Sequence, residues 1–289
     1  RKFYNLIFYI IQSIRGKTFF NKEFWKYALG FNIPLLAYYL SQVIFNQSDR
    51  IMISHITSTS DAAMYGVAYN LAMILTFVLN AINGSYVPWL YGKIKKNNAQ
   101  DNKSISLILI MLMGLIILCV IWYAPEIILI MAGKQYSVAI YVVAPVSMSL
   151  LLLFYSQLFI NIEFYYEEKK MLVYGSIGAA VLNIILNGLL IPIFGFVAAG
   201  YTTLISYIVF ALSNYYTMRL MLKKRKLDDD MYDYKLLLLL FVAFMISGFL
   251  GVSLYGNLIL RILITLVVFG LLVINKNKFI DALKKIKER

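Results

Sequence analysis

The segment YALGFNIPLLAYYLSQVIFNQSDRIMISHI, residues 27–56, decides the fold class of this chain. It is apolar over the length of a membrane-spanning helix, since about 20 such residues cover the hydrocarbon core of a bilayer. The run Asn46-Gln47-Ser48-Asp49-Arg50 interrupts it. A charged side chain at the bilayer centre costs about 2.5–3.5 kcal/mol on insertion scales. These side chains should therefore face a water-filled cavity, one another or a polar partner, and the segment predicts a membrane protein that handles something polar.

The composition of the whole chain agrees with this prediction. Hydrophobic residues make up 61% of the 289 positions and charged residues only 14%, whereas a soluble domain is about half apolar and a quarter charged. The net charge of +13 would suggest nucleic acid in a soluble protein, but in a membrane protein it reflects basic cytoplasmic loops. We therefore expect no nucleic-acid partner, and we also expect no cofactor.

Single cysteine and histidine residues restrict the chemistry further. Cys119 has no second cysteine with which to form a disulfide or a metal cluster, and His55 has no second histidine. The chain begins with Arg1 rather than Met and shows no signal-peptide pattern. We expect it to be the C-terminal part of a longer protein.

Apolar runs and their breakers predict an all-α integral membrane protein with about eight transmembrane helices. The predicted spans are residues 29–54, 62–90, 105–124, 138–162, 171–191, 197–221, 235–254 and 257–275. An amphipathic stretch from Phe3 to Ile14 precedes them, either as the tail of an earlier span or as a helix on the membrane surface.

Basic residues follow a regular alternation along the chain. Five segments hold 24 of the 27 Lys and Arg residues. They are residues 1–28, 91–104, 163–170, 219–235 and 276–289. Because cytoplasmic loops are enriched in Lys and Arg, we expect both chain ends in the cytoplasm, which eight spans allow.

Polar residues three or four positions apart form a line on one face of several predicted helices. These lines are Tyr38, Gln42, Asn46 and Asp49; Thr76, Asn80 and Asn83; Gln157 and Asn161, followed by Glu163; and Asn183 and Asn187. The sixth predicted span adds the polar residues Ser206, Ser213 and Asn214. Two interpretations stay open. The side chains line a hydrophilic cavity, or they join helices by hydrogen bonds worth about 0.6–2 kcal/mol each.

The ionised groups have alternatives as well. Arg50 is either a functional cation or a side chain that reaches the outer membrane interface. Asp49 is either the ion partner of Arg50 or a functional group in its own right. His55 is an interface residue or, as the weaker alternative, a proton relay.

The sequence Asp229-Asp230-Met231-Tyr232-Asp233 matches the DDxxD pattern that holds magnesium and diphosphate in prenyl-transferring enzymes. It follows the basic run Lys223-Lys224-Arg225-Lys226, and no second aspartate cluster exists in the sequence. A solvated charge run that balances its basic neighbour is therefore the favoured interpretation.

Two stretches resemble a known family. NQSDRIMI (46–53) with AAMYGVAY (62–69) resembles the seventh span and following loop of Wzx-type polysaccharide flippases. NIILN (183–187), IPIFG (191–195) and AAGYTT (198–203) resemble their eleventh-to-twelfth span signature, which the wider multidrug/oligosaccharidyl-lipid/polysaccharide superfamily shares. Relatives often carry Gly-Ala-Ala in the last part, whereas here Phe196-Val197 precede Ala198.

This resemblance implies a fold with two lobes around a central cavity, of which this chain supplies the second. The domains would be a cytoplasmic or interfacial segment (1–28), a six-helix lobe (29–222), and two additional helices with a basic tail (223–289). The bundle would resemble the C-terminal lobe of a MATE-like flippase plus those two helices, and the N-terminal lobe is missing.

The implied activity is that of a non-enzymatic transporter in the bacterial cytoplasmic membrane. It would flip undecaprenyl-diphosphate-linked oligosaccharide repeat units for O-antigen, capsule or exopolysaccharide synthesis by alternating access. Arg50 would attract the diphosphate or a charged sugar, and Asp49 would hold its rotamer or couple to cations. The other substrate-binding candidates are Gln42, Asn46, Asn80, Asn83, Gln157 and Asn161.

The implied partners are the lipid-linked substrate, the bilayer, the missing lobe, a polysaccharide polymerase and a chain-length regulator. The alternative within transport is a cation-coupled multidrug exporter of the same superfamily. A membrane-embedded glycosyl- or prenyltransferase is less favoured, because the predicted outer loops are too short to carry a catalytic cluster.

Overall fold

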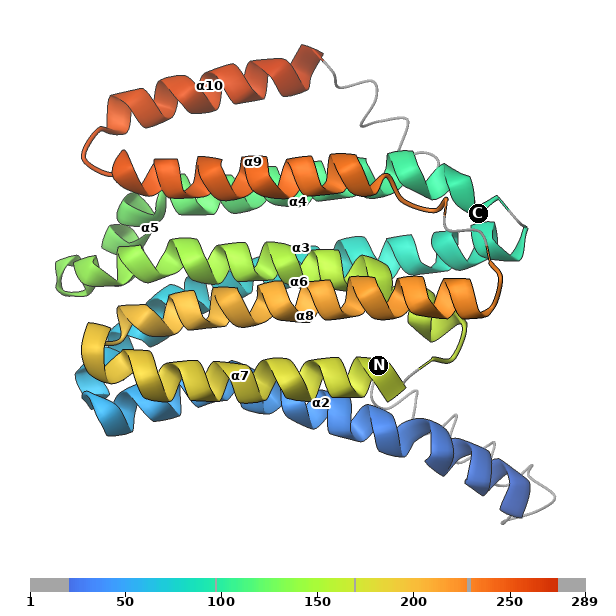
Figure 1. Cartoon of the computed structure of the whole chain (residues 1–289). Helices are drawn as coiled ribbons and strands as arrows, with labels where there is room; N and C mark the ends of the chain where they lie inside the picture. The colour runs from blue at the N-terminus through green and yellow to red at the C-terminus, as the bar shows by residue number, and fades with distance from the viewer. Residues whose placement is uncertain (1–20, 97, 169, 228–229, 275–289) are drawn as a thin grey trace, which may run out of the picture.

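The protein is a layered bundle of long, roughly antiparallel helices, seen here in a computed structural model (Figure 1). The structure describes residues 21–96, 98–168, 170–227 and 230–274, so the predicted amphipathic stretch Phe3–Ile14 lies outside the described residues. Within these ranges no strand is present. The helices are α2 (Lys22–Ile56), α3 (Thr59–Lys95), α4 (Asn102–Trp122), α5 (Ala124–Met131), α6 (Ile140–Tyr165), α7 (Lys170–Phe194), α8 (Val197–Lys224), α9 (Tyr234–Ser253) and α10 (Leu258–Ile274), with 3₁₀ turns η1 (Ala99–Asp101) and η2 (Lys134–Ala139).

The predicted all-α membrane fold is confirmed. Seven helices of the described part are long and apolar enough to cross a membrane, and Leu258–Val268 adds a shorter apolar segment. Each predicted span coincides with one long helix. Differences occur at the ends: α2 begins at Lys22 because the Asn21 side chain accepts hydrogen bonds from the Glu23 and Phe24 amides.

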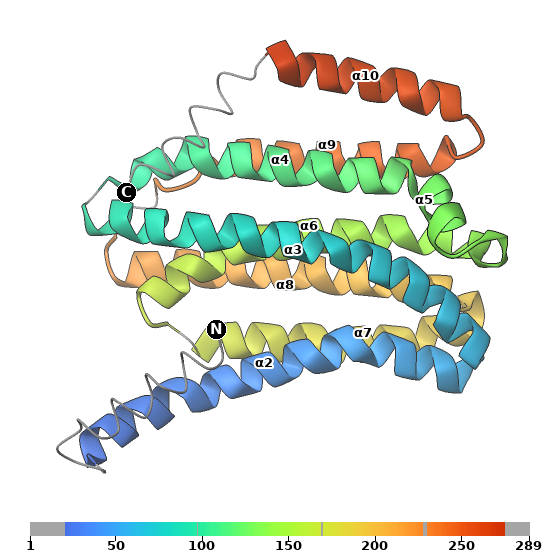
Figure 2. The same ribbon diagram turned by 180° about the vertical axis from the view of Figure 1, so that it is seen from behind.

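The helices form two layers with α6 between them. Figures 1 and 2 show α2, α3 and α4 on one side and α7, α8 and α9 on the other. In its most apolar window α6 is 72% buried, whereas the corresponding window of α2 is only 19% buried. The side chains that α6 shares with its neighbours therefore form the core, and α2 and α7 lie together at one edge.

The two C-terminal helices attach to the edge opposite α2. Helix α9 packs on α4 and α6 and approaches them closely at glycines. A Cβ atom at Gly114 would lie 2.3 Å from the Phe244 ring, and one at Gly251 would lie 2.1 Å from Trp122. Small residues allow such close helix packing in membranes, so larger side chains at these two positions would displace α9.

Helix α5 and turn η2 were not predicted. They occupy the connection between α4 and α6, where Pro125 stands in the first turn of α5. Gly133, with φ of +86°, separates α5 from η2. Both elements are shorter than a membrane span, so a search for long apolar runs passes over them.

Candidate functional site

Asp49 lies at the centre of a buried polar cluster near the end of α2. Its carboxylate is 0% exposed. It accepts hydrogen bonds from the Tyr65 hydroxyl on α3, from Asn187 Nδ2 on α7 at 2.6 Å and from the Thr203 hydroxyl on α8 at 2.7 Å. One carboxylate thus joins four helices. Carboxylates with several donors are stabilised by charge-assisted hydrogen bonds, which are stronger than neutral ones.

A second layer of side chains supports these donors. Asn183 Nδ2 donates to the Thr203 hydroxyl at 3.2 Å, and its Oδ1 accepts from Asn187 at 3.2 Å and from Ser48 at 3.1 Å. The Thr202 hydroxyl donates to Asn187 Oδ1. Asn183 and Asn187 therefore join α7 to α2 and α8, which is the helix-packing alternative of the sequence analysis.

Arg50 points away from this cluster, although it follows Asp49 in the chain. Its Nη2 donates to Asn70 Oδ1 at 2.7 Å, and its guanidinium carbon lies 4.8 Å from the centre of the Tyr69 ring. The Nε atom is buried and has no hydrogen-bond partner. Among the described residues no ion pair joins Arg50 to Asp49 or to any other acidic side chain. The interpretation of Asp49 as the ion partner of Arg50 is therefore wrong, because neutral donors already occupy both carboxylate oxygens.

Asn46 and Gln42 continue the polar line of α2 below Asp49. Both side chains are half-buried. Asn46 Oδ1 accepts a hydrogen bond from the Tyr69 hydroxyl at 3.0 Å and has the Tyr207 hydroxyl 3.5 Å away. Tyr69 of α3 thus contacts both Arg50 and Asn46 of α2.

A second polar region lies between α3 and α6. Asn161 Nδ2 donates to Asn83 Oδ1 at 2.8 Å. Asn80 is exposed on α3, whereas Gln157 on α6 has a buried Oε1 without a hydrogen-bond partner. The structure therefore brings Asn83 and Asn161 together and leaves the other two predicted residues separate from them. A role of these four residues in substrate binding stays a prediction.

Glu163 is a second buried carboxyl group, only 1% exposed, near the end of α6. The Thr217 hydroxyl of α8 donates to its Oε1. Its Oε2 is buried without a hydrogen-bond partner, as is Asn214 Oδ1 one turn away from Thr217 on α8. Buried polar atoms without partners are uncommon in folded proteins, so this region contains unused hydrogen-bonding capacity.

Arg261 joins α10 to α5 through an ion pair with Glu126. It is 2% exposed and binds both carboxylate oxygens of Glu126 on α5, at 2.6 and 2.8 Å. These hydrogen bonds lower the pKa of the Glu126 carboxyl below its usual value. Arg261 also donates to the Trp122 carbonyl. This ion pair fastens α10 to the end of α4 and to α5.

The DDxxD sequence is used for structure where it is described. Asp230 forms an ion pair with Lys103. The Asp233 side chain accepts from the Leu236 amide at 3.1 Å and caps α9. Asp229 lies outside the described residues. His55 is exposed in the last turn of α2. Over the described ranges, no group of three or more His, Cys, Asp or Glu side chains could hold a metal ion.

Several residues of the Asp49 cluster were not singled out from the sequence as site residues. Tyr65, Thr202 and Thr203 belong to stretches that were noted only for their resemblance to the flippase signatures, and Asn70 directly follows one of these stretches. Their position in or beside these stretches is the one feature of the sequence that could have pointed to them. Their contacts with Asp49 and Arg50 depend on how α3 and α8 pack against α2.

The architecture is similar to that of two solved transporters. Among solved structures, a multidrug resistance MATE family transporter of the MOP superfamily, in an outward-facing conformation, matches with a TM-score of 0.55 and 19% identity. A MOP superfamily transporter from Pyrococcus furiosus matches with a TM-score of 0.54 and 18% identity. Each match covers 78% of this chain and 52% of the other, so the chain spans about half the length of these transporters. The shared feature is the fold.

Sequence comparison supports a more particular family. The family described as "Polysaccharide biosynthesis protein" matches residues 2–92, a range that includes Asp49 and Arg50. A Haemophilus influenzae protein named for its Lsg locus is 27% identical over 167 residues, which are 55% of this chain and 40% of that protein. These matches relate the first third of the chain to polysaccharide biosynthesis proteins, and the fold is one that transporters of the MOP superfamily also have.

Proposed function

We propose that this chain is the second lobe of a flippase that moves undecaprenyl-diphosphate-linked oligosaccharide repeat units across the bacterial cytoplasmic membrane. The lobe would work by alternating access against the lobe that this chain lacks. The family match and the transporter fold support a transporter of the polysaccharide type. The lipid-linked substrate is an inference from the chemistry of Arg50.

The position of Arg50 carries the proposal. Its guanidinium is held by Asn70 and the Tyr69 ring, contacts no carboxylate among the described residues and keeps one buried N–H without a partner. A guanidinium presents a planar set of donors that fits phosphate oxygens and keeps its charge when partly buried. Arg50 can thus receive a diphosphate without first breaking an ion pair.

Asp49 would act as a positioning residue for Arg50. Because Tyr65, Asn187 and Thr203 hold its carboxylate, the turn of α2 that carries Arg50 has a defined orientation. Gln42, Asn46, Asn80, Asn83, Gln157 and Asn161 would bind sugar hydroxyl groups as the lobes move. The coupling ion is left open by this assignment.

The proposed topology places both chain ends in the cytoplasm. Lys103 and Asp230, from two of the basic loops, form an ion pair, and the Asn102 side chain donates to the Met231 carbonyl at 3.1 Å. These two loops therefore lie at the same end of the bundle, as the positive-inside pattern requires. A polysaccharide polymerase and a chain-length regulator are the proposed partners at the membrane.

Complementation tests the substrate and the site together. The full-length protein, in a strain that lacks its own repeat-unit flippase, should restore surface glycan. Arg50→Ala should lose most of the activity and Arg50→Lys should retain part of it, because lysine keeps the charge and loses the planar fork. Lys134→Ala, an exposed basic residue of a connecting turn, is the matched control and should be fully active. Full activity of a normally expressed Arg50→Ala variant would refute the role of Arg50.

The drug exporter remains the second candidate because of the two buried carboxyl groups. Asp49 and Glu163 have no ion partner among the described residues, and buried acids are suited to coupling transport to cations. Failure of both wild type and variants to restore glycan, with normal membrane expression, would favour this candidate. Cation-dependent efflux of a fluorescent drug would then establish it.

A further inference from the structure

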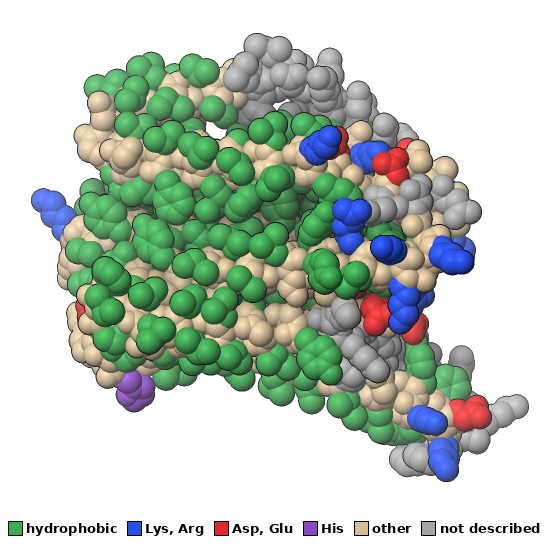
Figure 3. All heavy atoms as spheres, viewed as in Figure 1, with side chains coloured by type: hydrophobic (Ala, Val, Ile, Leu, Met, Phe, Trp, Pro, Cys, Tyr) green, Lys and Arg blue, Asp and Glu red, His purple; other side chains and the backbone are tan. Residues whose placement is uncertain are grey.

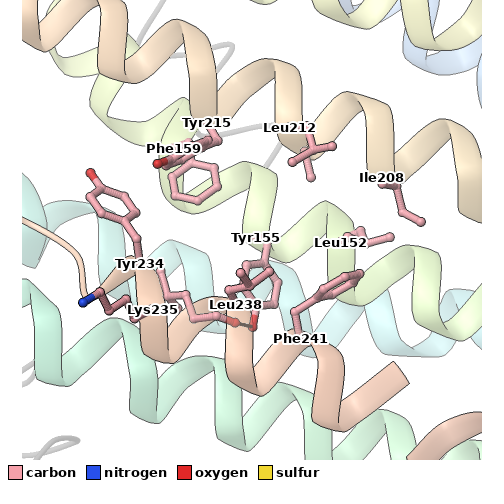
Figure 4. Close-up of a pocket in the computed structure, with 12 residues that line it drawn as sticks. Leu152, Tyr155, Phe159, Ile208, Leu212, Tyr215, Tyr234, Lys235, Leu238 and Phe241 are labelled. Carbon is pink, nitrogen blue, oxygen red and sulfur yellow. Dashed lines mark hydrogen bonds between the residues drawn. The ribbon is translucent and has the colours of Figure 1, made fainter. Parts of the chain in front are cut away.

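A groove of about 380 Å³ lies between α6, α8 and α9 (Figure 4), and its lining includes neither Asp49 and Arg50 nor the side chains bonded to them. It opens to the side of the bundle, because Leu212 of α8 and Leu238 of α9 line it and are 59% and 63% exposed. Its size is within the range of about 300–1,000 Å³ of small-molecule sites. In a membrane, this opening faces lipid.

The two ends of the groove differ in chemistry. Leu152, Ile208 and Phe241 form one end, which carries only hydrocarbon (Figure 4). Tyr215, Tyr234 and Lys235 form the other end. From Ile208 to Tyr215 the groove follows α8 for about 10 Å. It is therefore an elongated apolar groove that runs along the helices and ends at polar side chains.

A positive charge lies at the polar end. Lys235 lines the groove and is exposed. The Arg219 guanidinium lies 5.2 Å from the centre of the Tyr234 ring and 5.9 Å from that of Tyr215. The basic residues 223–226 follow at the end of α8, and Figure 3 shows Lys and Arg side chains gathered at this end of the bundle.

Nearby acidic groups are engaged elsewhere. Asp230 forms its ion pair with Lys103, and Asp233 caps the first turn of α9. No salt bridge of Lys235 is found within the described part of the chain. An anion that enters this end of the groove would therefore meet the Lys235 ammonium group at a depth where lipid head groups lie.

We propose that this groove binds one acyl chain of an anionic glycerophospholipid, with the lipid phosphate on Lys235. The groove fits a single flexible hydrocarbon chain, and the ammonium group at its end fits the head group attached to that chain. Because its walls come from α6 and α8 on one side and α9 on the other, the bound lipid fastens α9 to the six-helix part of the bundle. This inference is independent of the transported substrate.

Lipid retention by the purified full-length protein tests the inference. The protein in detergent is titrated with phosphatidylglycerol or with phosphatidylcholine, and bound lipid is counted by native mass spectrometry. Phosphatidylglycerol should bind more tightly, and Lys235→Gln should weaken it about fivefold, as expected for one basic side chain near an anionic head group. Lys134→Gln, a basic residue distant from the groove in the sequence, should leave retention unchanged.

Filling the groove provides a matched pair of variants on α9. Leu238→Trp should abolish retention of both lipids, because the indole occupies the groove. Leu239→Trp should retain them, since Leu239 is equally exposed, at 62%, and does not line the groove. Equal retention in the two tryptophan variants, or equal affinity for the two lipids in the wild type, would overturn the proposal. Both variants should migrate as monodisperse protein, which excludes misfolding as the cause of any loss.

Discussion

Asp49 and Glu163 are two buried carboxyl groups that bind threonines of the same helix, yet their surroundings differ. Thr203 and Thr217 are separated by about 21 Å along α8. Three donors from three helices hold Asp49. Among the described residues, Thr217 is the one side chain that donates to Glu163, and the second oxygen of Glu163 has no partner there. The Asp49 end of α8 is therefore saturated with hydrogen bonds. The Glu163 end retains acceptors that a proton, a water molecule or a rearranged neighbour can use.

We therefore expect the Asp49 cluster to contribute more to stability than the Glu163 region does. Removing a saturated acceptor leaves several buried donors unpaired, and each costs about 1–3 kcal/mol. Changing a group that has one partner disturbs much less. We expect the Asp49 cluster to keep α2, α7 and α8 together, and the Glu163 region to tolerate changes of hydrogen bonding. Four predictions examine this comparison, and all use apparent melting temperatures of the full-length protein in detergent.

Asp49→Ala should have the largest effect. The Tyr65, Asn187 and Thr203 donors would lose their acceptor inside the bundle, and we expect a destabilisation of at least about 3 kcal/mol. Asp101→Ala is the control, because Asp101 is exposed and its pair with Lys93 is worth at most about 1 kcal/mol. An equal change in the two variants would contradict the structural role of Asp49.

Of the two amide variants, Asp49→Asn should lose about 2–3 kcal/mol more unfolding free energy than Glu163→Gln. At Asp49 the new NH₂ group would face groups that are already donors. At Glu163 it would face a region with unpartnered acceptors, so this variant should lie within about 1 kcal/mol of wild type. A greater loss in Glu163→Gln than in Asp49→Asn would reverse the comparison.

When each threonine of α8 is replaced by valine, Thr203→Val should be less stable than Thr217→Val by about 1 kcal/mol of unfolding free energy. Thr203→Val removes a donor to Asp49 and an acceptor for Asn183. Thr217→Val removes a single side-chain partner, Glu163. Because valine has nearly the shape of threonine, the melting temperatures report the hydrogen bonds. Thr217→Val as the more damaging change would show that Glu163 depends on its one partner more than the geometry indicates.

Glu126 is a third carboxyl group, and it forms an ion pair with Arg261. Its removal should lower the melting temperature less than any of the changes above. Its side chain is 33% exposed, so solvent reduces the pair to about 1 kcal/mol or less. Its folded-state pKa is lowered. The stabilisation is therefore complete above the unfolded value of about 4.3 and is lost as the pH falls through the folded value.

The melting temperature of wild type should accordingly exceed that of Glu126→Gln at pH 7, and this difference should disappear below about pH 4. Asp101→Asn serves as the reference for an exposed acid. A difference that stays constant over this range would show that Arg261 does not depend on the ionised form of Glu126.

Much of the architecture could be predicted because it depends on local hydropathy. Long apolar runs indicate spans wherever they occur, and the eight predicted spans correspond to eight helices. The start of α2 at Lys22 and the short helix α5 were not predicted. A side-chain cap at Asn21 and a proline in a connection determine them, and both signals are weak beside 20 apolar residues.

The candidate site was predictable in part. Asn183 and Asn187 were noted as a polar line, and the structure places both in the Asp49 cluster. The separation of Asp49 from Arg50 could not be foreseen, since adjacent helical residues point about 100° apart and their partners come from other helices. Likewise, neither Tyr65 nor Thr203 differs in sequence from any other tyrosine or threonine of a span.

The sequence by itself determined that this chain is a helical membrane protein, with a cation within its first span and basic residues concentrated in alternate loops. These properties follow from hydropathy, charge and local motifs, which act residue by residue. Only the tertiary structure decided which polar groups meet. Asp49 joins four helices through its hydrogen bonds, Arg50 contacts Asn70 and the Tyr69 ring, and a groove lies between α6, α8 and α9. Such contacts depend on how helices far apart in the chain pack together.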